Sequence, residues 1–149
     1  MERTNRVICN LTISADGYSA GLNQTEERPF GDDGGDGWGD KLHAWTHHAR
    51  ESQPMDGGTT YHFVTDGVES ALARARAAAG DGDVAIMGGA NTINQYLAAG
   101  LVDELRLHIV PLTLGAGTRL FEGVPPLKLE QVKSRAGSSV THVTYRVLS

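Results

Sequence analysis

Two adjacent glycines in front of a helix-like segment are the residues of this sequence best suited to hold a ligand. Gly88 and Gly89 directly follow the apolar run 84–87, and residues 91–99 then have helical spacing. Glycines lack a Cβ, so a ligand can approach their backbone closely. The first turn of a helix adds unpaired N–H groups and a positive dipole end. The pattern is typical of a phosphate or pyrophosphate site, although a tight strand-to-helix connection without a ligand has the same sequence.

Other side chains that could do chemistry form weaker patterns. Among six histidines, His43 and His47 are four residues apart and His48 is a neighbour, so a helix would bring the first two to one face. No cysteine or carboxylate completes a ligand spacing there, and we expect no metal site. The single cysteine, Cys9, lies in an apolar run and is interpreted as a buried, unreactive thiol.

The elements that must position these residues alternate between strands and helices. The patterns predict strands at 6–13, 59–65, 83–87 and 104–111, a C-terminal hairpin of 127–134 with 140–148, and helices at 40–51, 67–79 and 91–99. Asp66 and Glu69 have the spacing of a capping box for the second of these helices. The order predicts an α/β sheet, parallel in the middle and closed by an antiparallel edge.

The length, composition and net charge of the chain predict a single-domain globular protein. The chain has 149 residues, 40% of them hydrophobic and 21% charged, which predicts one domain over residues 1–149. A net charge of −5 argues against a nucleic-acid partner, because phosphate contacts require a basic face. No run approaches a membrane span, and residues 1–6 lead into a strand without a signal-peptide core, so we expect a cytoplasmic protein with no membrane partner.

Several segments taken together resemble the C-terminal reductase domain of the bacterial riboflavin-biosynthesis deaminase-reductases, a group within the dihydrofolate reductase-like family. The matching segments are 13–18, 88–90 through Leu97, 100–105, 110–111, 114–117 and 120–121. The resemblance implies an α/β, three-layer dihydrofolate reductase-like fold with a central mixed sheet. It also implies an NADPH-dependent oxidoreductase that transfers hydride to a small heterocyclic or conjugated substrate, with chemistry supplied by the cofactor.

The resemblance assigns roles to residues at matching positions. Asp16, in the segment after the first strand, becomes a catalytic carboxylate that faces the substrate, although an exposed Asp-Gly turn is an equally good interpretation. The contacts to the NADPH pyrophosphate become Gly88, Gly89, Ala90, Asn91 and Thr92.

The sequence departs from the family around residues 45–46. Family domains place two further strands and a helix before the segment that matches 59–65, so about six strands are expected here, with two central family strands missing. If strand 59–65 pairs with strand 83–87, the sheet order is second, third, first, fourth, then the hairpin. Thr46 and Arg50 match the hydroxyl and the cation that follow the missing block. They are candidate contacts for the adenosine 2′-phosphate, and a helix surface is the alternative.

A shortened sheet leaves an apolar edge, and such an edge favours association with a second chain. We therefore expect a homodimer. The alternative to a reductase is a non-catalytic, dimeric binding or scaffold relative that has lost part of the cofactor cleft, since fold alone does not establish activity.

Overall fold

A computed structural model describes residues 5–21, 53–54 and 57–148 of the chain. The predicted helix at 40–51 lies outside the described residues. So do Thr46 and Arg50, the two candidates for the adenosine phosphate, and the histidines at 43, 47 and 48.

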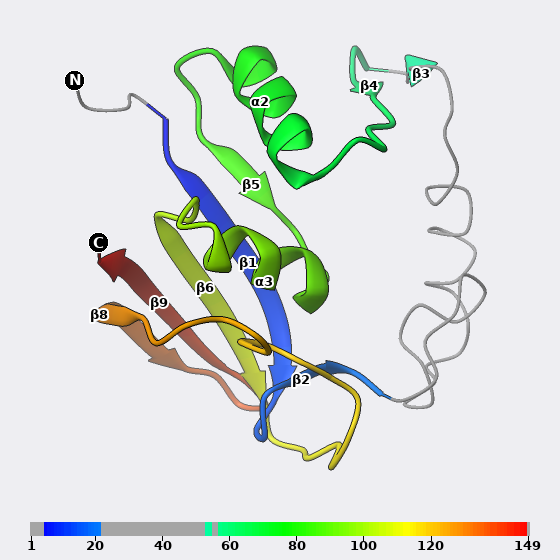
Figure 1. Cartoon of the computed structure of the whole chain (residues 1–149). Helices are drawn as coiled ribbons and strands as arrows, with labels where there is room; N and C mark the ends of the chain where they lie inside the picture. Colours follow the sequence, from blue (N-terminus) through cyan, green and yellow to red (C-terminus); the bar gives the residue numbers. More distant parts are fainter. Residues whose placement is uncertain (1–4, 22–52, 55–56, 149) are drawn as a thin grey trace.

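The centre of the structure is a five-stranded mixed sheet in the order β5-β1-β6-β9-β8 (Figure 1). Strand β1 is parallel to β5 and β6, whereas β9 is antiparallel to both β6 and β8. The strands are β5 (Val84–Ile86), β1 (Val7–Ser14), β6 (Glu104–Val110), β9 (Thr141–Leu148) and β8 (Lys128–Ala136). The predicted parallel centre and antiparallel C-terminal hairpin are confirmed.

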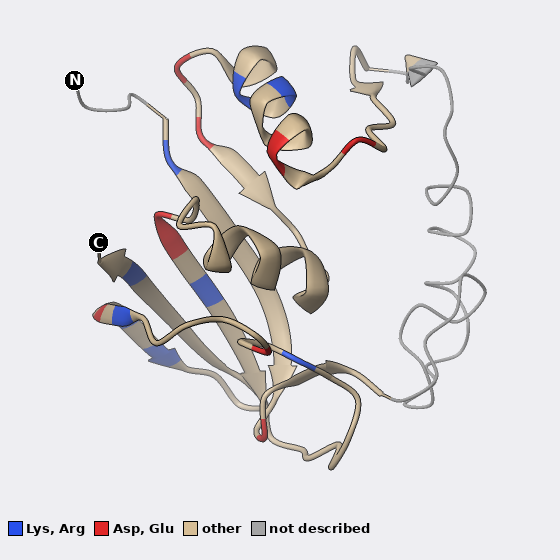
Figure 2. Ribbon diagram, in the orientation of Figure 1, with Lys and Arg blue, Asp and Glu red and all other residues tan. Residues whose placement is uncertain are grey.

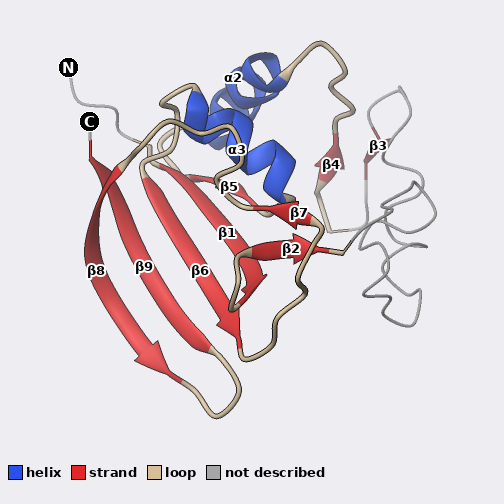
Figure 3. Cartoon of the chain, turned by 60° about the horizontal axis from the view of Figure 1, so that its bottom comes forward, coloured by secondary structure: helices blue, strands red, loops and turns tan. Residues whose placement is uncertain are grey.

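Two helices, α2 (Val68–Ala79) and α3 (Ala90–Ala98), cover one face of this sheet (Figure 3). Alternate residues of β1 point toward them, because side chains of a strand alternate between faces. Val7, Cys9 and Leu11 are buried in one core with Leu72 of α2 and Ile93 of α3. The described residues therefore form two layers, one of helices and one of sheet, where the resemblance implies three.

The predicted strand at 59–65 differs most from the structure. Only β4 (Thr60–Tyr61) is a strand, and it pairs with β3 (Gln53–Pro54) in a separate two-stranded sheet. The expected pairing with β5 is therefore wrong. Both residues of β4 are exposed. Residues with high β-propensity form long strands when they pack on a core, and neither residue of β4 is buried in this way.

Strand β5 is less buried than its apolar sequence predicts. Val84 is buried, but Ala85 is exposed and Met87 has 77% of its surface accessible. Within the described part of the chain β5 pairs only with β1, so it forms an edge of the sheet rather than its interior.

The start of α2 also differs from the prediction. Gly67 is the N-cap residue and provides no side-chain hydrogen bond. Asp66 instead accepts a hydrogen bond of 3.0 Å from the Ser70 hydroxyl, so the capping box with Glu69 is wrong. The chain turns at Gly67 with φ +113, a conformation that glycine allows and aspartate rarely adopts. The predicted end of α2 at Ala79 is confirmed, with Gly80 as the C-cap residue.

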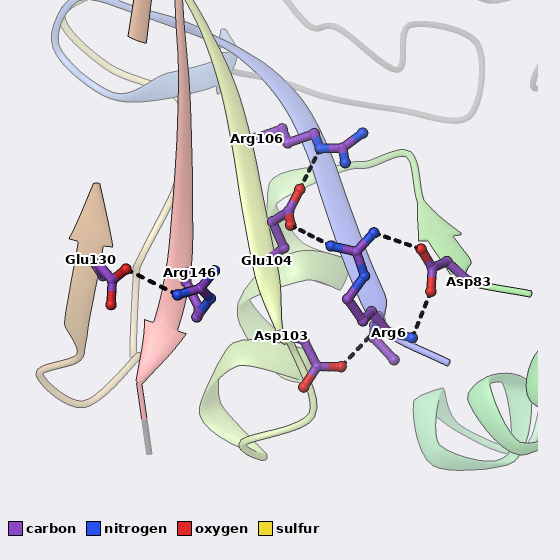
Figure 4. Close-up of polar contacts among 8 residues, drawn as sticks. Arg6, Asp83, Asp103, Glu104, Arg106, Glu130 and Arg146 are labelled. Atoms are coloured by element: carbon purple, nitrogen blue, oxygen red, sulfur yellow. Dashed lines mark hydrogen bonds and ion pairs between the residues drawn. The ribbon is translucent and has the colours of Figure 1, made fainter. Parts of the chain in front are cut away.

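The remaining strands form a small ribbon beside the carboxyl end of β1. Strand β2 (Tyr18–Ala20) pairs antiparallel with β7 (Thr118–Arg119). At the opposite end of the sheet, Arg6 forms ion pairs of 2.8 Å with Asp83 and 2.9 Å with Glu104 (Figure 4). These pairs connect the starts of β1, β5 and β6. Neither of the two described helices is long and apolar enough for a membrane span.

Candidate functional site

The Gly88-Gly89 turn joins β5 to α3 at the carboxyl end of the parallel strands (Figure 1). The peptide between the two glycines is cis. Gly88 has φ +113, a region that side chains rarely adopt, and a Cβ there would lie 3.6 Å from Cδ1 of Leu11 in β1. Apart from Gly89 itself and its two chain neighbours, no described atom lies within 4 Å of a Cβ built on Gly89. The turn is thus seated against β1 on one side and open on the other.

At the amino end of α3, the backbone N–H groups donate no capping hydrogen bond to a side chain of the N-cap residue. The first hydrogen bond of the helix runs from Ile93 N to Gly89 O over 3.0 Å, so the amides of residues 90–92 precede it. The N-cap residue Gly89 contributes no side-chain acceptor, and the first turn has no acidic residue. Figure 2 shows α3 without charged residues. The dipole end is therefore unneutralised by the helix itself, which favours an anion.

The predicted cofactor contacts differ in how accessible their side chains are. Asn91 is exposed and Thr92 half-buried at the amino end of α3, whereas Ala90 is buried in the core. Asn91 and Thr92 could therefore contact a ligand through side chain and amide, and Ala90 through its amide alone. Gly88, Gly89 and these three residues form one continuous turn, as the sequence predicts.

Asp16 lies at the carboxyl end of β1, away from this turn. It lies in the turn two residues beyond Ser14, the last residue of β1, whereas Gly88 lies beside Leu11, three residues before that end. The strands β1 and β5 are parallel, so both features belong to the same end of the sheet.

The Asp16 carboxylate holds together two loops. It accepts hydrogen bonds from the Ser14 hydroxyl at 2.6 Å, from Leu114 N at 3.1 Å and from Gly115 N at 2.8 Å. The same Ser14 hydroxyl accepts a hydrogen bond of 3.0 Å from Tyr18 N. The turn after β1 is thereby fixed to the loop after β6.

These donors also determine the charge of Asp16. The hydrogen bond from Ser14, followed by those from Gly115 and Leu114, lowers the pKa of Asp16 to about 2. The carboxyl group is ionised at neutral pH and has no proton to deliver. It can orient neighbouring groups, but its present contacts do not suit it to act as an acid.

Asn94 is a site-forming residue that the sequence patterns do not reveal. Its side chain is 6% exposed within α3, donates a hydrogen bond of 3.0 Å to Arg119 O and accepts one of 2.7 Å from Phe121 N. It thereby fixes the loop after β7 to α3 and places the ribbon beside the helix. The sequence offers one signal for this role, which is a polar asparagine at a position of the helical pattern that otherwise holds buried apolar residues. That signal can be recognised only when the neighbouring buried positions of α3 are known.

Comparison with protein families finds a match to a known domain family. Residues 63–143 match the model of the RibD C-terminal domain, a range that includes β5, the glycine turn, α3 and β6. A search of curated proteins finds the uncharacterized protein YyaP of Bacillus subtilis (strain 168), 42% identical over 65 residues. That match covers 42% of this chain and 35% of YyaP, so it spans about a third of the relative's length.

Solved structures share the fold over most of the chain. A putative riboflavin biosynthesis protein from Shewanella sp. PV-4 has a TM-score of 0.63 at 20% identity, over 97% of this chain and 99% of that one. The Saccharomyces riboflavin biosynthesis reductase Rib7 has a TM-score of 0.58 at 15% identity, over 97% and 89% of the two chains. The predicted α/β, dihydrofolate reductase-like fold is confirmed at this level.

Proposed function

Because this chain belongs to the RibD C-terminal domain family, we propose that it is a reductase that binds NADPH at the amino end of α3. In this proposal the nicotinamide supplies hydride to a small heterocyclic or conjugated substrate. The observation that carries the proposal is the open Gly88-Gly89 turn, behind which the amides of residues 90–92 precede the first helical hydrogen bond.

The pyrophosphate fits this turn for five physical reasons. The amides of residues 90–92 can donate to phosphate oxygens, the dipole of α3 favours negative charge, and no acidic side chain in the first turn competes. Gly89 leaves space above the backbone. Ligands of open α/β sheets also bind outside the carboxyl ends of the strands, where this turn lies.

The rest of the site would orient the substrate rather than exchange protons. Asp16 stays ionised and fixes the turn after β1 to Leu114 and Gly115, so its proposed role is to position this wall of the site. Thr46 and Arg50 remain the proposed contacts for the 2′-phosphate, which requires a cation because α3 has none.

Titration of the protein with NADPH, followed by nucleotide fluorescence, tests the proposal. The wild type is expected to bind. Asn91→Asp adds one negative charge to the first turn of α3 with almost no change in size, and a charge close to the phosphates should weaken binding by about tenfold or more. The same charge favours the helix dipole, so the thermal stability should stay equal or rise.

Gln95→Glu is the matched control, because it adds the same charge one turn further along an exposed face of α3. It should leave NADPH binding nearly unchanged. A folded wild type that ignores NADPH at millimolar concentration would overturn the proposal. That result would favour the alternative, a non-catalytic scaffold, which the structural engagement of the Asp16 carboxylate already supports.

A further inference from the structure

The sheet face opposite the helices carries a pair of histidines from neighbouring strands. His108 of β6 and His142 of β9 are direct cross-strand partners. Their Nδ1 atoms lie 2.8 Å apart, with ring centroids separated by 5.0 Å and planes inclined by 72°. Both side chains are half-buried. We propose that these two imidazoles bind a divalent transition-metal ion of the Zn²⁺ or Cu²⁺ class.

The distance between the two nitrogens is close to what such an ion requires. Bonds of about 2.0–2.1 Å to a tetrahedral Zn²⁺ place two ligand nitrogens about 3.3 Å apart. The pair therefore has to open by roughly half an ångström, and each imidazole has to turn so that its Nδ1 lone pair points at the ion instead of at the other nitrogen. The backbone ladder of β6 and β9 holds the two Cα atoms opposite each other before any ion arrives.

Asn10 supplies the outer contact that a metal-binding imidazole uses. Its Oδ1 lies 3.4 Å from His108 Nε2. If that nitrogen carries the proton, His108 Nδ1 presents a lone pair toward His142, as ligation requires. When the ion binds, His142 moves its proton from Nδ1 to Nε2, and both imidazoles remain neutral ligands.

Two arginines flank the histidine pair along the sheet, Arg106 two residues before His108 on β6 and Arg135 on β8. The Arg106 guanidinium is itself held by Glu104 at 2.6 Å (Figure 4), which offsets its repulsion of a cation. Arg135 of β8 is opposite His142 in the ladder and is exposed.

The protein would supply two of the ligands and water the others. In the described part of the chain no group of three or more His, Cys, Asp or Glu side chains could hold a metal ion. Imidazole ligands without a carboxylate favour Zn²⁺, Cu²⁺ or Ni²⁺ over Ca²⁺ and Mg²⁺, which prefer oxygen.

Addition of ZnCl₂ to the tag-free wild-type protein, monitored through the imidazole nitrogens by ¹H–¹⁵N NMR, tests the site without a mutation. The Nδ1 resonances of His108 and His142 should shift together, whereas those of His62 should not. MgCl₂ should shift neither. If Zn²⁺ leaves both Nδ1 resonances in place, the proposal is overturned.

Calorimetric titration of variants gives an independent test. His108→Gln and His142→Gln should each remove one equivalent of bound Zn²⁺, and Asn10→Ala should weaken that equivalent by about tenfold. His62→Gln is the control, because His62 contacts Arg74 far from this face, and it should retain the stoichiometry. If the folded His108 and His142 variants bind as much Zn²⁺ as the wild type, the proposed site is wrong. Binding of Zn²⁺ by other histidines would give that result.

Discussion

Asp16 illustrates how a carboxylate in a family motif can serve the architecture of a site. It accepts three hydrogen bonds, one from the Ser14 hydroxyl and two from the amides of Leu114 and Gly115. The sequence places the residue correctly in a turn after β1, but its partners come from a loop 98 and 99 positions away. Local sequence cannot show such contacts, so it predicts the turn that holds Asp16 but not the partners of its carboxylate.

Asp16→Asn should destabilise the fold in a pH-dependent way. The amide keeps one acceptor oxygen and presents N–H groups in place of the other, where the amide of either Leu114 or Gly115 also donates. Because the folded-state pKa of Asp16 is depressed from 3.8 to about 2, the stabilisation by the carboxylate is present above pH 4. It is lost as the pH falls through about 2. Urea unfolding at pH 7 should show a less stable variant, and the difference from wild type should shrink toward pH 2.

Asp81→Asn is the control for loss of a charge, since Asp81 is exposed in the loop after α2. It should unfold like wild type at both pH values. A constant difference between the Asp16 variant and wild type across the acid range would show that the charge of Asp16 does not stabilise the fold.

At the scale of elements, the periodicity of apolar residues correctly predicts the helices and strands that bury one face in the core. Helix α3 buries Ile93, Tyr96 and Leu97 as expected, and β6 alternates buried Leu105 and Leu107 with half-buried polar residues. The segment 59–65 has strand-like residues but no such buried face, and only Thr60–Tyr61 forms a strand. Propensity without a partner therefore overestimates that element.

Strand β7 depends on a glycine that the sequence presents only as part of a turn. Gly117 has φ +137, and a Cβ on it would lie 2.0 Å from the Ala20 carbonyl oxygen. Gly117→Ala should therefore separate β2 from β7 and destabilise the fold by about 2 kcal/mol or more. Chemical denaturation measures the loss.

Gly115→Ala separates the effect of dihedral angle from that of contact. Gly115 has φ +77, with nothing within 4 Å of an added Cβ. Its substitution should cost about 1 kcal/mol, the penalty of a left-handed residue alone. If the two variants lose the same free energy of unfolding, the close approach of Gly117 to the Ala20 carbonyl does not constrain the fold.

At the scale of the whole molecule, the sequence lacks two strands of the family and therefore predicts an unpaired sheet edge. Strand β5 provides such an edge in the described residues. Val84 N donates to Arg6 O at 2.9 Å, so the backbone groups of Val84 face β1. Since successive residues of a strand alternate in direction, the N–H and C=O of Ala85 face away from β1. Exposed Met87 continues this edge with an apolar side chain. In the described residues these groups form a template for a further strand.

We predict that the protein is a homodimer that pairs through this edge. Light scattering coupled to size exclusion should give twice the chain mass at micromolar concentration. Ala85→Pro removes the outward N–H without removing a β1–β5 hydrogen bond, and it should shift the protein toward monomer. Ala85→Val keeps the N–H, favours a strand and should leave the dimer intact. A wild type that is monomeric, or a proline variant that stays fully dimeric while folded, would show that β5 is not the interface.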